Sequence, residues 1–135
     1  MSHYLEIKTR ITNQSALVSA LCRMGFTKNQ IEVHEKATNL YGYHGDKRAQ
    51  VANVILRRKN VGASSNDIGF VKTKDGTYEA IISEFDKRKY NDQWLNKVGT
   101  YHGVENAKQA FTAHNWDYTE SVDDKGRIQL IGTTY

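Results

Sequence analysis

The residues of this chain that are best suited to chemistry are its histidines and its cysteine. The five histidines lie at positions 3, 34, 44, 102 and 114, and no two have the short helical spacing that brings ligands together around a metal ion. Cys22 has no sequence neighbour that would stabilise a thiolate, and Ser64-Ser65 lacks the flanking glycines of a hydrolase nucleophile elbow. We therefore expect no catalytic constellation, no metal site and no cofactor.

A segment that mixes aromatic and basic side chains is the stronger candidate for binding. Its aromatic and basic members are Tyr41, Tyr43, His44, Lys47 and Arg48. Aromatic rings beside cationic side chains can stack nucleobases and hold their phosphates. The same pattern also suits the end of a β-strand with one tyrosine in the core and a turn at Gly45-Asp46, because aromatic residues are common in strands. Both interpretations stay open at the level of sequence.

Positive charge is in mild excess and gathers in short clusters. The chain has 19 Lys and Arg against 15 Asp and Glu, which gives a net charge of +4. The clusters are Lys47-Arg48, Arg57-Arg58-Lys59 and Lys87-Arg88-Lys89. If they shared one face, they would form an electrostatic footprint for nucleic acid. The candidate binding residues are accordingly Tyr41, Tyr43, His44, Lys47, Arg48, Arg57 and Arg58.

The segment from Asn66 to Ile82 has the pattern of a β-hairpin. Two runs rich in apolar residues flank Asp75-Gly76, a pair that suits a two-residue turn with positive φ at both positions. Such a turn would place Lys72 opposite Glu79 and Phe70 opposite Ile81, which are favourable cross-strand pairs. We predict that this hairpin anchors the sheet.

Hydrophobic periodicity predicts the remaining elements. Alternation over residues 3–11 predicts a strand, and further strands are predicted over 31–34, 38–43 and 50–57. Apolar steps of three and four predict one helix capped at Thr12 or Asn13 that ends at Gly25, and a second over 91–114. Gly99 and Gly103 predict a kink or break in the second helix, since glycine weakens helices. A solvated loop is predicted over 59–66 and a second hairpin over 116–131.

Runs of strands separated by helices predict an α+β fold, with a mainly antiparallel sheet and two helices packed on one face. The length of 135 residues is that of one domain, so we expect residues 1–135 to form a single domain. Apolar runs such as Ala80-Ile81-Ile82 are too short to span a membrane, and the N-terminus lacks the pattern of a secretory signal. We therefore expect a cytoplasmic protein without a membrane partner.

Several short motifs along the chain resemble a known family. They are Met1-Ser2-His3-Tyr4, Ile7-Lys8-Thr9, Leu17 through Gly25-Phe26, Gly42-Tyr43-His44-Gly45, Asp67-Ile68-Gly69-Phe70, Gly76-Thr77-Tyr78-Glu79 and Asp124-Lys125-Gly126-Arg127-Ile128. In this order they resemble the hypothetical chloroplast reading frames, a domain of unknown function found in algal plastids and cyanobacteria, with relatives in other bacteria and in phage. The resemblance implies a cytoplasmic, plastid-stroma or host-cytoplasm setting, and it implies no activity.

Three functions are compatible with the sequence. The leading hypothesis is a non-enzymatic accessory or adaptor domain that binds another protein, because strand edges can pair with a partner. The alternative is a basic nucleic-acid-binding module that uses the candidate residues named above. The third is a small enzyme or ligand-binding module that uses His44 with Tyr41 or Asp67. The sequence leaves the oligomeric state open.

Overall fold

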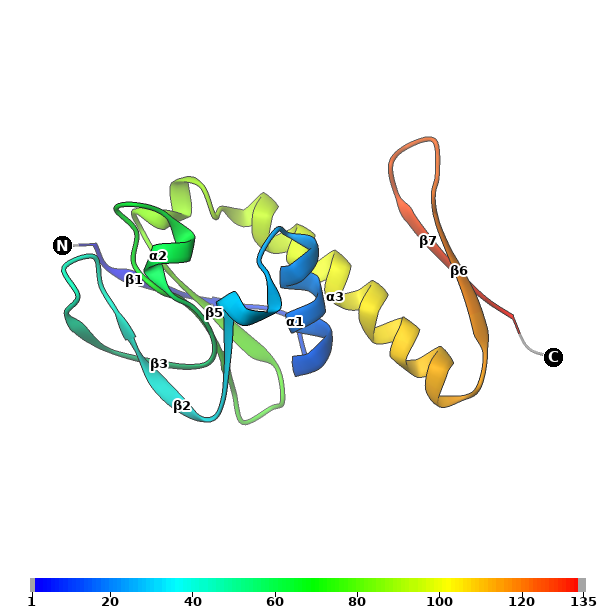
Figure 1. The fold of residues 1–135 in the computed structure, drawn as a ribbon, viewed down its shortest axis with the longest axis horizontal. Helices are drawn as coiled ribbons and strands as arrows, with labels where there is room; N and C mark the ends of the chain where they lie inside the picture. Colours follow the sequence, from blue (N-terminus) through cyan, green and yellow to red (C-terminus); the bar gives the residue numbers. More distant parts are fainter. Residues whose placement is uncertain (1, 134–135) are drawn as a thin grey trace.

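A computed structural model describes residues 2–133 of the chain (Figure 1). Met1, which belongs to the first motif of the family resemblance, and residues 134–135 lie outside the described residues. The strands are β1 Tyr4–Lys8, β2 Ile31–Tyr41, β3 Lys47–Leu56, β4 Ile68–Lys72, β5 Tyr78–Ser83, β6 Asp117–Val122 and β7 Ile128–Thr133. The helices are α1 Gln14–Arg23, α2 Arg58–Val61 and α3 Asp92–Ala113, with short 3-10 turns at Lys28–Gln30 and Asp86–Arg88.

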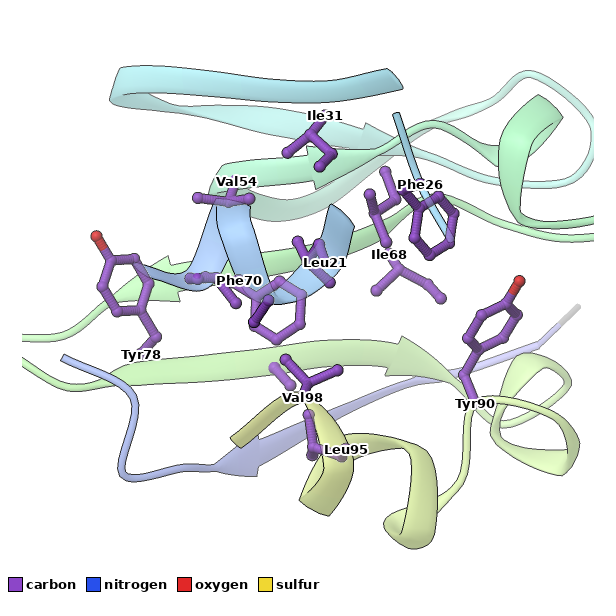
Figure 2. Packing of buried hydrophobic residues seen from close by; sticks show 14 of the residues in the cluster. Leu21, Phe26, Ile31, Val54, Ile68, Phe70, Tyr78, Tyr90, Leu95 and Val98 are labelled. Carbon is purple, nitrogen blue, oxygen red and sulfur yellow. The ribbon is translucent and has the colours of Figure 1, made fainter. Parts of the chain in front are cut away.

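The strands form two antiparallel sheets. One sheet has five strands in the order β1-β5-β4-β3-β2, and the other consists of β6 and β7. The two long helices cover one face of the larger sheet, where Leu21 of α1 and Val98 of α3 pack against Phe70 and other strand residues (Figure 2). The predicted α+β fold, with a mainly antiparallel sheet and two helices on one face, is confirmed.

Both helices begin where their capping residues predict. The side chain of Asn13 accepts a hydrogen bond from the N–H of Ala16, and Gly25 follows α1 with a φ of +110°. The side chain of Asn91 caps α3 in the same way. The predicted break in α3 is wrong, because the helix continues through both of its glycines for 22 residues. Glycine weakens a helix but keeps its N–H, so the hydrogen-bond ladder is not interrupted.

The turn between β4 and β5 has three residues rather than two. The N–H of Thr73 donates to the carbonyl of Thr77 at 2.8 Å, and Gly76 adopts a φ of +88°. Our predicted register was therefore wrong by one residue, and Phe70 lies opposite Ala80. The Asp-Gly pair also suits a three-residue loop with glycine in the left-handed conformation, so the dipeptide alone does not decide the register.

The hairpin of β2 and β3 bends sharply in its middle. Pairing steps from Val33–Val54 to Thr38–Ala52, so four residues of β2 face only Asn53 of β3. The side-chain amide of Asn53 donates to the carbonyls of residues 34 and 35, and its oxygen accepts the N–H of residue 72 at 2.9 Å. The first two bonds satisfy carbonyl groups of β2 that the interrupted pairing leaves unbonded, and the third satisfies an N–H of β4 beyond the end of its pairing with β3. The strands predicted over 31–34 and 38–43 are thus two parts of the bent strand β2.

The outer half of this hairpin covers the sheet face opposite the helices. Leu40 and Ala52 form a second buried cluster with Ile55 and Ile81. A Cβ atom on Gly69 would lie 2.5 Å from the Cβ of Ala52, which is closer than two carbon atoms can approach. Glycine is therefore required at this position for the hairpin to lie on β4.

The second hairpin, β6–β7, lies at the far end of α3 from the start of the chain (Figure 1). Phe111 of α3 stacks on Trp116 and Tyr118, with ring centroids 5.7 and 6.3 Å apart. Glu120 accepts from Arg23 and Lys108, each at 2.6 Å. Every residue of β6 is exposed, so these few contacts attach the hairpin to the helices. The hairpin predicted over 116–131 is confirmed.

Candidate functional site

One edge of the five-stranded sheet is open along β1. The carbonyl of His3 accepts the N–H of Glu84 at 2.8 Å, which shows that the odd-numbered residues of this segment direct their backbone groups toward β5. Because backbone groups alternate between the two edges of a strand, Tyr4, Glu6 and Lys8 direct theirs away from β5. No other strand of residues 2–133 pairs with β1. Three residues therefore offer N–H and carbonyl groups to an incoming strand.

A groove of about 870 Å³ lies beside this edge. Residues 7–12 form one wall, and α3 forms the other, with Leu95, Gly99 and Gly103 along it. A Cβ added to either glycine would meet nothing within 4 Å, so neither internal packing nor a positive φ explains these residues. Each glycine costs about 1 kcal/mol of helix stability relative to alanine. Because neither residue has a side chain, the groove stays open along this part of α3.

His102 holds the two walls of the groove together. It is 6% exposed, and its Nε2 accepts the N–H groups of Thr12 and Asn13 at 3.4 and 3.1 Å. An accepting Nε2 requires a neutral ring with its proton on Nδ1. Burial lowers the pKa of His102 and favours this neutral form. The spacing of Leu95, Val98 and His102 on one helix face was a sequence signal for this role that we missed.

Two cations without an acidic partner line the groove. They are Lys8 and Arg10, and within the described part of the chain neither forms an ion pair with an acidic side chain. The carboxylate of Asp92, which also lines the groove, is already paired with Lys87 at 2.6 Å. The groove beside Lys8 and Arg10 therefore favours a negatively charged group.

Three of the seven candidate residues from the sequence come together elsewhere. Tyr43, His44 and Arg48 line a second cavity of about 340 Å³ at the turn between β2 and β3. The other residues that line it are Ser2, Asp46, Ser64, Asn66 and Phe85. No residue of this cavity belongs to the groove beside β1.

The remaining four candidates do not line this cavity. Arg57 donates to both carboxylate oxygens of Glu32 and to Asp67, each at 2.8 Å, and its guanidinium lies 5.7 Å from the ring of Tyr41. The hydrogen bonds with Glu32 raise the pKa of Arg57 and lower that of Glu32. Arg57 and Tyr41 thus join the bent hairpin to the sheet. Lys47 is exposed and Arg58 is half-buried.

The hairpin is also held by two buried polar residues, Asn66, which we predicted at the end of a solvated loop, and Asp67, which we predicted at the start of the 66–82 hairpin. Asn66 and Asp67 are 3% and 1% exposed, and they accept the N–H groups of Tyr43 and Tyr41 at 2.9 and 2.7 Å. The amide of Asn66 in turn donates to Ser83 and Asp86. The loop predicted over 59–66 is correct for residues 62–66, which form no helix or strand, but residues 59–61 belong to α2. Ser65 and Asn66 at its end are buried, and the hydrogen bonds of Asn66 satisfy its side chain internally.

Among residues 2–133, no group of three or more His, Cys, Asp or Glu side chains converges as metal ligands would. None of the helices there is long and apolar enough to cross a membrane.

The geometry defines an α+β domain with an open sheet edge, a groove beside that edge and a separate polar cavity. The model of the family described as protein of unknown function, DUF1257, matches residues 25–131, so the chain belongs to this family. A search of curated proteins and a search of solved structures found no match. The family assignment supports the expected domain of unknown function, whereas the range of plastids, cyanobacteria and phage stays a prediction.

Proposed function

We propose that this chain is a non-enzymatic accessory domain that binds another protein by adding an extended segment of that protein to its sheet. The single observation that carries the proposal is the open edge at Tyr4, Glu6 and Lys8. A segment that pairs with these residues becomes a sixth strand beside β1. In this mode of recognition the main-chain hydrogen bonds give affinity, and neighbouring pockets select the side chains.

The groove indicates the chemistry of the partner segment. Side chains of a strand alternate between its two faces, so every second residue of the added strand would face α3 above Gly99 and Gly103. The wall residues Ile7 and Leu95 favour apolar side chains there. Lys8 and Arg10 favour an acidic residue where the segment passes the end of β1. The proposed partner segment therefore alternates apolar and polar residues and carries an acidic residue at one end.

A peptide selection tests this proposal. Random peptides about ten residues long, longer than an ordinary strand, are displayed and selected on the full chain. We expect enrichment of peptides with alternating apolar residues and an acidic end. Glu6→Pro removes an N–H that faces away from β5 and blocks the edge, and proline is tolerated at such positions. Glu6→Ala keeps the N–H and is the matched control.

The two variants distinguish edge pairing from adhesion to the surface. Peptides that bind the wild type and Glu6→Ala but not Glu6→Pro support the proposal. Peptides that bind Glu6→Pro as tightly as the wild type, or a selection that enriches none, contradict it.

A further inference from the structure

The cavity at the turn between β2 and β3 is lined by aromatic side chains that suit the binding of a flat ring. Its volume of about 340 Å³ falls within the range of small-molecule sites. Tyr43 and Phe85 are 46% and 39% exposed, and the ring of His44 lies 4.8 Å from that of Tyr43. Aromatic rings held in water at the rim of a cavity provide stacking surfaces for bases.

Two charged side chains in the cavity have hydrogen-bonding groups without a partner among residues 2–133. The carboxylate of Asp46 forms no hydrogen bond and no ion pair with any residue in the described range 2–133, and it is half-buried. Arg48 uses one terminal nitrogen to donate to the carbonyl of Ser2 at 3.1 Å, and its guanidinium lies over the ring of Tyr4 at 4.7 Å. Its remaining N–H groups have no acceptor in the described chain. An acceptor and several donors thus lie unused in one small cavity.

The cavity walls are positioned by hydrogen bonds before any ligand arrives. The N–H of Tyr43 is held by the buried side chain of Asn66, and the N–H of Phe85 donates to the hydroxyl of Ser2 at 2.9 Å. The N–H of Gly42 donates to the carbonyl of Asp46 at 2.8 Å and closes the turn. Such a site loses little conformational entropy when a ligand binds.

We propose that this cavity binds the guanine base of a nucleotide. Guanine is the common base whose pairing edge carries a ring N–H next to an amino group, two adjacent donors that match the two oxygens of Asp46. Its neighbouring carbonyl oxygen can accept from Arg48. The faces of the base stack on the aromatic walls. Arg88, whose guanidinium lies 4.2 Å above the ring of Phe85, adds positive charge near a phosphate.

The other bases match this arrangement less well. Adenine has a ring nitrogen that accepts hydrogen bonds beside its amino group. The lone pair of this nitrogen would be repelled by the carboxylate of Asp46. Uracil has one ring N–H between two carbonyl acceptors. Cytosine has one amino group followed by two acceptors. Asp46 would therefore select guanine over the other three bases. This site is separate from the proposed strand addition, because the cavity and the groove share no residue.

Calorimetric titration of the full chain tests the proposal, with the monophosphates of guanosine, adenosine, cytidine and uridine as probes. We expect the guanosine nucleotide to bind at least about tenfold more tightly than the others, a difference that one charge-assisted contact can supply. Asp46→Asn should abolish this preference. Tyr43→Ala should weaken all binding, whereas Tyr118→Ala, which removes an exposed tyrosine of the separate β6–β7 sheet outside the cavity, should leave nucleotide binding unchanged and is the matched control.

Two further probes separate the sources of the base and the role of charge. A short single-stranded RNA with one guanine that binds more tightly than the mononucleotide, and is sensitive to Asp46→Asn, identifies RNA as the source. An RNA that binds no better identifies the free nucleotide. The proposal is overturned if adenosine monophosphate binds as tightly as the guanosine nucleotide, if inorganic phosphate displaces it at equal concentration, or if Asp46→Asn leaves binding unchanged.

Discussion

At the scale of single residues, polar side chains fix the bend of β2 and the segments around the groove and the cavity. Asn53 holds the bend of β2, Asn66 and Asp67 hold the β2–β3 hairpin, and His102 holds the residues before α1. Each of them forms hydrogen bonds with backbone groups that strand pairing and helix hydrogen bonds leave without a partner. Only His102 had a local signal, its spacing from Leu95 and Val98 on one helix face, whereas an Asn or Asp has the same local pattern at the surface as in the interior.

His102 gives a prediction about stability and its pH dependence. His102→Ala leaves the N–H groups of Thr12 and Asn13 without an acceptor and should lower the free energy of unfolding by about 2 kcal/mol. His102→Gln keeps an acceptor and should lose less. The folded state has the lower pKa, so the unfolded chain takes up a proton as the pH falls below about 6.5 and the folded chain resists it. The wild type should therefore lose stability below that pH, and His102→Gln should lose less of it. Equal pH profiles in urea unfolding would contradict this role.

Arg57 gives a second prediction at this scale. Arg57→Met removes the cationic partner of Asp67, which is 1% exposed and keeps only backbone N–H donors. We expect a loss of about 3 kcal/mol in unfolding free energy, the usual result of leaving a buried charge unpaired. Arg58→Met, next in the sequence and without a side-chain ion pair in residues 2–133, should change stability by less than about 0.5 kcal/mol. Similar losses in the two variants would show that the network around Asp67 does not depend on Arg57.

At the scale of elements, substitutions at the two glycines of α3 distinguish an effect on stability from an effect on binding. Gly99→Ala and Gly103→Ala should each raise the free energy of unfolding by about 0.5–1 kcal/mol, because the new methyl groups meet open space. Gly99→Leu should also fold but should fill the groove and prevent binding of the selected peptides. Thermal unfolding and peptide affinity measure the two effects. If Gly99→Leu binds peptides like the wild type, the groove is not part of the site.

The elements and the pairing within two hairpins, β4–β5 and β6–β7, were largely predictable, whereas the register of β4–β5 and the bend of β2 were not. Periodicity located the first strand and both long helices, and β-rich runs bounded by turn residues located the other strands. The register of β4 and β5 depends on whether Gly76 closes a two-residue or a three-residue turn, and the Asp-Gly pair permits both. The bend in β2 depends on Asn53, which lies in the neighbouring strand. Such long-range bonds leave no local pattern.

At the scale of the whole molecule, the β6–β7 hairpin should behave as a separable unit. A two-stranded hairpin is marginally stable alone, and this one is attached mainly through Phe111 and Glu120. Phe111→Ala should therefore release it while the five-stranded sheet stays folded. Hydrogen exchange should show amide protection lost in β6 and β7 and kept in β3, β4 and β5. Loss of protection in both sheets together would show that the hairpin supports the whole fold.

The candidate sites arise at the same scale, which is why the sequence predicted them only in part. Tyr43, His44 and Arg48 are close in sequence and were recognised together, whereas Phe85 reaches their cavity from another part of the chain. The open edge follows from the strand order, in which Tyr4 pairs with Ser83 and β1 has no second neighbour in the described range. Strand order is decided by contacts between distant segments, and hydrophobic periodicity contains no record of it.

The most direct test of strand addition is amide hydrogen exchange in β1, with and without a selected peptide. Pairing at the open edge should slow exchange of the Tyr4, Glu6 and Lys8 amides on binding. The amides of Leu5 and Ile7 already face β5 and should change little. This alternation is the result that the account predicts. Unchanged exchange at Tyr4, Glu6 and Lys8 in the peptide-bound protein would contradict it.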